Sequence, residues 1–160
     1  MSLVVNYWDL GSVVPLLSTE LNSLASSAGL TAGAISSVGG TSGLFNNVYS
    51  GGGLGGFPLG EYELELAAPG GTLTAGTAAF FWFLNGVDGT HYEDGSASVI
   101  PARSPDLVIP IRAVSTTQRI IVFAPLPANS FYVLCAQNTG QAWGATANTL
   151  KVTPVTNQIG

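Results

Sequence analysis

Residues 61–68 read EYELELAA and alternate strictly between polar and apolar side chains. Successive side chains of a β-strand point to opposite faces of a sheet, so the alternation predicts a strand with one buried face. The face expected to point into a core carries Tyr62, Leu64 and Leu66. The opposite face, expected to point away from that core, carries Glu61, Glu63 and Glu65.

Further segments of strand length follow along the chain. Residues 77–84, TAAFFWFL, form a continuous apolar run, as expected of a strand covered on both faces. Turn signals such as PGG, EDG and NTG separate the remaining segments, which are SASVI (96–100), LVIPIRAV (107–114), QRIIVFA (118–124), SFYVLCAQ (130–137) and NTLKVT (148–153). Pro110 cannot donate to a sheet ladder, so its segment is expected at an edge or a bulge. The pattern predicts an all-β fold, a jelly-roll-like antiparallel β-sandwich over residues 60–160.

The predicted core draws on several of these segments. Trp82 lies inside FFWF and is expected to be buried in it. Cys135 shares a strand face with Phe131 and Val133, so a buried and inert thiol is expected. As the single cysteine of the chain, it excludes an internal disulfide. The residues expected to be buried are Leu64, Leu66, Phe81, Phe83, Ile109, Ile121, Phe123, Val133 and Leu134.

Residues 1–59 are predicted to form an N-terminal arm, with a short strand at LVVNYW (3–8) and one helix over about residues 15–28. Pro15 suits a first helical turn, and Gly29 suits a C-terminal cap. A stripe that must dock on another surface consists of Leu17, Leu21 and Leu24. Residues 29–60 then hold 11 of the 21 glycines. The anchors expected to lodge this stretch in grooves of neighbouring chains are Leu44, Phe45, Val48 and Tyr49.

Composition bounds the classes of partner. The chain has 160 residues, the length of one domain, and only 8% of them are charged, against about 25% in an average protein. Such a surface offers little like-charge repulsion, so we expect much of it to be buried in an assembly. The net charge is −5 with four basic residues, which excludes the basic stripe of a nucleic-acid-binding protein. Neither a membrane-spanning run nor a secretion signal is recognisable, so no membrane partner and synthesis in the cytoplasm are expected.

Three motifs invite a chemical interpretation, and each has a plainer structural one. GGGLGG (51–56) fits a dinucleotide-binding pattern, but a strand follows it where a helix is needed. DGTHYEDG (88–95) has acidic side chains for a cation, yet the chain has no second histidine, and the motif is typical of a polar hairpin tip. The three glutamates of residues 61–65 fit a solvated strand face better than a catalytic pair. No catalytic residue, cofactor or metal ligand is therefore assigned, and no enzyme activity is expected.

Trp143 lies in the short polar loop GQAWGAT and is the aromatic residue that we expect at a surface. A contact with a protein partner is the first interpretation of this ring. Stacking on a glycan is the alternative.

Several strings resemble a family of small bacteriophage virion structural proteins. They are TELNSLAS, ISSVGGTSGLFNN, FFWFLNGVDGTHYEDG, RAVSTTQRI, PLPANSFYVLCAQNTGQAW and NTLKVTPV, spread from about Thr19 to Val155. The resemblance implies a non-enzymatic component of the particle, most plainly a head decoration (cement) protein on the capsid surface. Its implied partners are the major capsid protein and copies of itself, with a trimer suited to threefold positions of a shell. The first residues, MSLVVNYWDLGSV, depart from the family pattern.

Three other functions stay open from the sequence. The protein is alternatively a tail or fibre component that binds host glycans through Trp143. It is alternatively a major subunit of a tube or shell, although the chain is short for that role. A β-sandwich enzyme that uses His91 is the third alternative, and the sequence offers little support for it.

Overall fold

Two antiparallel β-sheets make up the described part of the computed structural model, which covers residues 6–27, 30, 33–35, 45–46, 57–86 and 91–159. The strands are β1 (Asn6–Leu10), β2 (Val14–Leu17), β3 (Ala34–Ile35), β4 (Phe45–Asn46), β5 (Leu59–Leu66), β6 (Ala78–Asn85), β7 (Leu107–Pro110), β8 (Gln118–Pro125), β9 (Ser130–Gln137) and β10 (Thr149–Ile159). A single 3-10 turn, η1 (Thr19–Leu21), is the one helical element among these residues. The all-β prediction is therefore confirmed.

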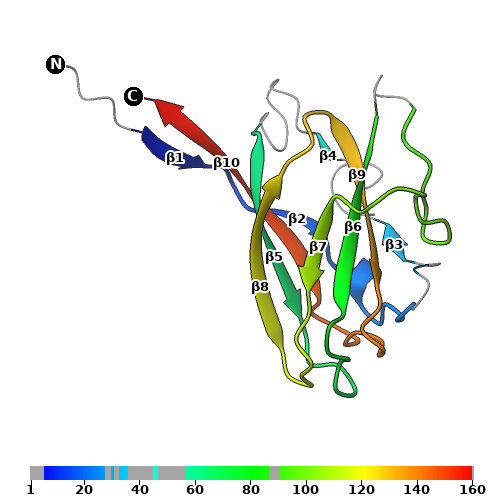
Figure 1. The fold of residues 1–160 in the computed structure, drawn as a ribbon. Helices are drawn as coiled ribbons and strands as arrows, with labels where there is room; N and C mark the ends of the chain where they lie inside the picture. Colours follow the sequence, from blue (N-terminus) through cyan, green and yellow to red (C-terminus); the bar gives the residue numbers. More distant parts are fainter. Residues whose placement is uncertain are drawn as a thin grey trace.

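The two sheets have the same number of strands and pack face to face (Figure 1). The first sheet has the order β1-β10-β5-β8, and β2 also pairs with β10. The second sheet has the order β3-β9-β6-β7, and β4 also pairs with β9. Neighbours in both sheets are distant in sequence, so most of the stability of each strand comes from long-range pairing. The arrangement is β-sandwich-like.

The core lies between the sheets and follows the alternation of β5. Tyr62, Leu64 and Leu66 are buried as predicted, and Glu61 lies on the opposite face. The Tyr62 ring stacks on Phe83 of the second sheet with 5.8 Å between ring centroids. The remaining large members of the cluster come from both sheets and include Leu16, Leu17, Leu21, Phe81, Ile109, Phe131, Val133, Leu150 and Val152.

The helix predicted over residues 15–28 is wrong. Residues 14–17 form β2, which pairs antiparallel with β10, and η1 follows directly. Leu16 and Leu17 are both fully buried, and the register of β2 with β10 shifts between Leu150 and Lys151, so the strand departs from strict alternation at this point. A short helix is marginal in water by itself, whereas pairing with β10 bonds the backbone and buries these side chains together.

The segment after η1 is bonded to the body rather than separate from it. Asn148 donates through Nδ2 to Asn22 Oδ1 at 2.9 Å and to the Gly144 oxygen at 2.6 Å. Gln137 donates through Nε2 to the Leu24 oxygen at 2.9 Å. Residues 22–24 are thus hydrogen-bonded to the loops and strands of the body.

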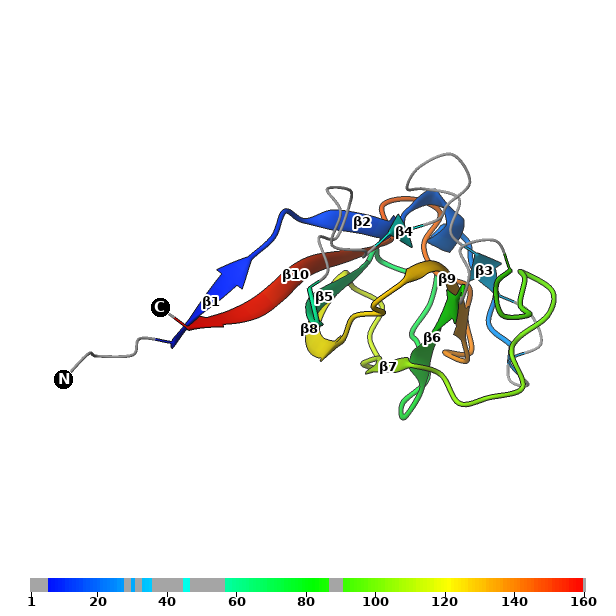
Figure 2. The same ribbon diagram turned by 90° about the horizontal axis from the view of Figure 1, so that it is seen from above.

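A two-stranded ribbon of β1 and β10 extends beyond the body, as Figure 2 shows. The backbone register runs from Asn6 opposite Ile159 to Leu10 opposite Val155. Nearer the body, β10 continues between β2 and β5. The ribbon therefore leaves the first sheet at Val155, which pairs with both Leu10 of β1 and Leu59 of β5.

Candidate functional site

An apolar groove lies on the outer face of the first sheet, where the ribbon leaves the body. It has a volume of about 480 Å³ and is lined by Leu10, Leu59, Glu61, Phe123 and Val155. Leu10 is 61% exposed and Phe123 is 66% exposed, although both side chains are large and apolar. The backbone register sets Val155, Leu59 and Pro125 side by side in one row across three strands. The groove is open to a partner of apolar character.

The orientation of β8 creates this surface and corrects one expectation. Ile121 and Phe123 were expected in the core, but they are 52% and 66% exposed on the outer face. Gln118 lies on the inner face, where its buried side chain accepts a bond from the Arg112 N–H and donates to the Arg112 oxygen, both at 3.0 Å. With Gln118 turned inward, the side-chain period of two turns Ile121 and Phe123 outward.

A cluster of ion pairs borders the groove on the same face. Arg119 Nη2 lies 2.9 Å from Glu65 Oε2, and Arg119 Nε lies 3.7 Å from Glu63 Oε1. Lys151 Nζ lies 3.7 Å from Glu63 Oε1. The bond to Glu65 is the main cause that raises the pKa of Arg119. The glutamates therefore balance basic side chains of their own sheet, and among the residues that the structure describes no ion pair includes Glu61.

The sequence-predicted partner residues lie mostly elsewhere. Leu17 and Leu21 are fully buried in the core of their own chain, and Leu24 packs against that core. Their burial leaves Leu17 and Leu21 no surface for a neighbouring chain, so that assignment is corrected. Phe45 is placed by its backbone, which pairs with Phe131 in β9. The other three predicted anchors, Leu44, Val48 and Tyr49, lie outside the described residues.

Trp143 is likewise buried, with 3% of its surface exposed. Its backbone N–H donates to the Leu24 oxygen at 3.1 Å, which brings the loop under the N-terminal segment. The expectation of a surface ring is therefore wrong, because that segment covers the loop. Without an exposed face, this ring has no surface on which a sugar could stack.

Residues 91–106 cover the outer face of the second sheet. The Arg103 guanidinium pairs with Glu93 and, at 2.8 Å, with Asp106, and these bonds raise its pKa. The Arg103 oxygen accepts a bond from Trp82 Nε1 at 3.0 Å. Trp82 is thereby buried as predicted, with Leu84, Leu134 and Ala136, while SASVI contributes only an isolated bridge between Ser96 and Val99.

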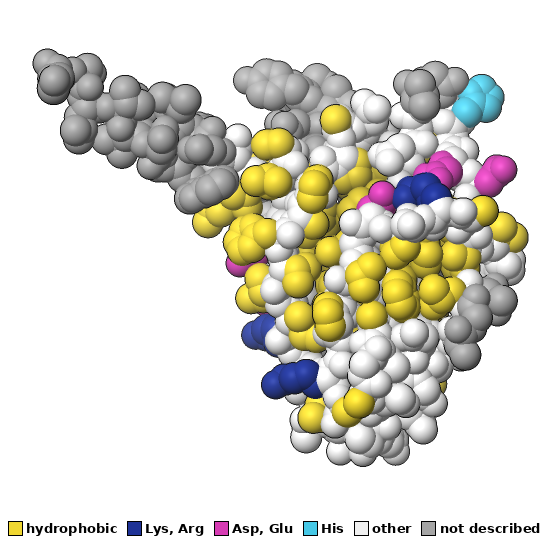
Figure 3. Space-filling model, viewed as in Figure 1, with side chains coloured by type: hydrophobic (Ala, Val, Ile, Leu, Met, Phe, Trp, Pro, Cys, Tyr) yellow, Lys and Arg dark blue, Asp and Glu magenta, His cyan; other side chains and the backbone are white. Residues whose placement is uncertain are grey.

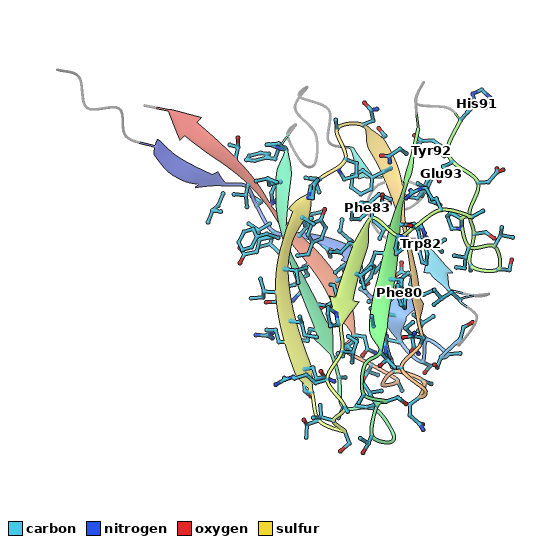
Figure 4. All side chains as sticks on the ribbon, in the orientation of Figure 1. Phe80, Trp82, Phe83, His91, Tyr92 and Glu93 are labelled. Atoms are coloured by element: carbon cyan, nitrogen blue, oxygen red, sulfur yellow. The ribbon has the colours of Figure 1, made fainter. Side chains whose placement is uncertain are left out.

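The DGTHYEDG motif does not assemble a ligand set in the described region. Glu93 bonds to Arg103, and Figure 4 shows His91 at the rim of the molecule, apart from Phe80 and Trp82. No group of three or more His, Cys, Asp or Glu side chains converges among the described residues. Asp88 lies outside the described residues, so the structure does not place the whole motif.

The Cys135 thiol and the Asp106 carboxylate, two groups that could take part in chemistry, are buried or hydrogen-bonded in the structure. Burial raises the pKa of the Cys135 thiol well above its usual value, so this sulfur stays protonated and shielded. Asp106 accepts a bond at 2.7 Å from the Phe83 N–H through Oδ2. No helix in the described part of the chain is long and apolar enough to cross a membrane. The outer face of the first sheet is the best candidate for an interaction surface. It carries the apolar groove and the exposed side chains of Ile121 and Phe123 on β8.

No family model matches the sequence, and neither a curated protein nor a solved structure matches it.

Proposed function

We propose that this protein is a non-enzymatic structural component of a bacteriophage particle, a decoration protein that bridges and stabilises subunits of the capsid shell. Its partner is the major capsid protein, and its location is the capsid surface. The apolar groove beside Phe123 is the observation that carries the proposal. The resemblance of the sequence strings to small virion proteins supplies the biological setting.

The strand order supports a jelly-roll-like sandwich as part of this proposal. With β1 and β2 counted as one strand, and β3 and β4 as one, the sheets have the orders 1-8-3-6 and 2-7-4-5 along the chain. This is the order of a double Greek key, the arrangement that jelly rolls share. Viral capsid and lectin domains use that fold, so the topology favours a virion role by analogy.

The surface supports a cementing role for a physical reason. Burying one side chain such as Leu or Phe contributes about 1.5–3 kcal/mol, and the groove presents Leu10 and Phe123 together. When this protein binds across the junction between two shell subunits, the subunits cover these side chains, and the burial energy is gained without any chemical step. Separating the subunits would expose the side chains again, so the bound protein opposes separation. Glu61 at the edge of the groove adds a place for a hydrogen-bond donor or a basic side chain.

The test uses the phage whose genome encodes this chain. Particles are assembled with and without the protein, and capsid rupture on heating is followed through the fluorescence of a DNA-binding dye. A lower rupture temperature without the protein, restored when purified protein is added, is the expected result. An unchanged rupture temperature contradicts the cementing role.

Two variants distinguish specific contact at the groove from non-specific binding through exposed apolar side chains. Phe123→Ser removes an apolar side chain from the groove, and Val99→Ser removes a comparably exposed one from a loop of the second sheet. We expect Phe123→Ser alone to lose co-sedimentation with protein-free shells. Gold-labelled antibody on intact particles locates the protein, and label on tails instead of heads contradicts the proposal.

A further inference from the structure

Strand β8 is the last strand of the first sheet and has one open edge. Among the described strands it pairs only with β5, in an unshifted register from Leu59 opposite Pro125 to Leu66 opposite Gln118. Edge strands are commonly protected by lysine, an internal proline or a bulge. Here the register has no bulge, and the single proline is the final residue of the strand. No other strand of the described residues pairs with β8, so we take its second edge as the one open to a further strand.

Between Ile120 and Ala124 both faces of β8 are apolar. Ile121 and Phe123 project outward, and the residues that alternate with them, Ile120, Val122 and Ala124, are only partly buried against the core. Figure 3 shows hydrophobic side chains gathered over β8 and the neighbouring β7. A strand added at this edge would cover apolar side chains on both faces as well as form backbone hydrogen bonds.

We propose that the occupant of this edge is β8 of a second copy of the chain, paired antiparallel about a twofold axis with Ile121 opposite Ile121. In this register Arg119 of each copy lies opposite Phe123 of the other, on the same face of the joined sheet. A guanidinium over an aromatic ring is a favourable contact, and directly opposite pairs are the unit of sheet stabilisation. The sequence of β8 is therefore complementary to itself in this register.

The surrounding charges agree with the same pairing. Glu61 lies beside Phe123 in the register of β5 and β8, and no ion pair of the described residues includes it. Arg119 of the second copy enters that row next to Phe123. At each end of the joined strands, Arg119 of one copy thus lies in the same row as Glu61 of the other copy, with Phe123 between them.

The twofold pairing joins the two first sheets into one continuous sheet. Because the axis is perpendicular to that sheet, both outer faces point the same way, and the two apolar grooves lie on one side of the dimer. This association is a property of the purified chain and holds whether or not the protein is part of a particle. It gives a dimer, in contrast to the trimer that threefold shell positions favour.

Sedimentation velocity of the full chain over a range of concentrations tests the pairing. The wild-type protein is expected at twice the chain mass of 16.3 kDa. Ile121→Lys and Ile121→Glu each place like charges opposite one another at the axis, and we expect each to weaken the dimer at least about tenfold. An equimolar mixture of the two variants is expected to recover a dimer, because Lys then lies opposite Glu.

Val99→Lys is the matched control, because Val99 is 56% exposed in a loop of the second sheet, away from β8. It is expected to dimerise as the wild type does, and circular dichroism checks that every variant keeps its sheet content. A monomeric or trimeric wild type overturns the inference. So does an Ile121→Lys variant that dimerises normally, or a charge-swapped mixture that stays monomeric.

Discussion

Replacing Leu21 by alanine tests whether the N-terminal segment is part of the isolated fold. Leu21 is fully buried in the cluster between the sheets. Alanine removes three carbon atoms from that site, which at about 0.8 kcal/mol each corresponds to about 2.4 kcal/mol of lost transfer energy. The cavity left behind adds to this loss, so we expect the free energy of unfolding to fall by about 2–5 kcal/mol.

The assay is guanidinium unfolding of the purified protein, followed by tryptophan fluorescence. Trp82 and Trp143 are both buried, so their emission shifts when the core opens. In a thermal melt each kcal/mol lowers the midpoint by about 2–4 °C for a protein of this size. Leu21→Met keeps the volume and is expected to cost less than about 1.5 kcal/mol. Val13→Ala, at a 59% exposed position, is expected to stay within about 0.5 kcal/mol of the wild type.

One result refutes this reasoning. If Leu21→Ala unfolds with the same free energy as Val13→Ala, the segment is not packed on the core of the free protein. The stripe of Leu17, Leu21 and Leu24 would then dock on another surface, as predicted from the sequence.

Three further predictions follow from buried polar and titratable groups. Asn148→Ala is expected to lower the free energy of unfolding by about 1–3 kcal/mol, because it leaves the Ala67 N–H and the Gly144 oxygen unpaired, while the exposed Asn129→Ala changes little in the same unfolding assay. Burial, and secondarily the charge of Asp106, raise the pKa of Tyr62. The native phenol therefore keeps its proton while the unfolded one loses it near pH 10, so stability falls above about pH 10, and Tyr62→Phe is expected to lose part of that slope in unfolding curves from pH 8 to 11. The Cys135 thiol is expected to be silent toward a colorimetric thiol reagent in the native state and to react once guanidinium unfolds the chain; reaction of the native protein at the rate of a free thiol would contradict its burial.

The sequence determines the orientation of β5 because only one of its faces is apolar. Three glutamates mark the solvent side, so the buried residues Tyr62, Leu64 and Leu66 follow directly. In β8 the same reasoning fails, since residues 120–124 are apolar at every position. The orientation is marked by Gln118, which bonds to Arg112 on the inner face, and by Arg119, which pairs with Glu63 and Glu65 on the outer face; neither set of contacts is visible in the alternation of residues 120–124. Ile121 and Phe123, of which Phe123 lines the candidate groove, were therefore assigned to the wrong face.

The N-terminal error has a related cause. The leucine spacing over residues 17–24 fits a helix locally, but the strand that pairs with Val14–Leu17 lies in β10, more than a hundred positions along the chain. Local periodicity carries no information on such a partner.

The pairing of Asn6 with Ile159 has a mechanical consequence. A tension that pulls these two positions apart loads the β1–β10 ribbon at its open end, where the rungs of hydrogen bonds break one after another, as in a zipper. A strand stretched along its length instead loads all of its rungs at once. We therefore expect the molecule to yield at low force when tethered through these positions, and to resist far more strongly when the tethers are attached to opposite ends of β5 and β8.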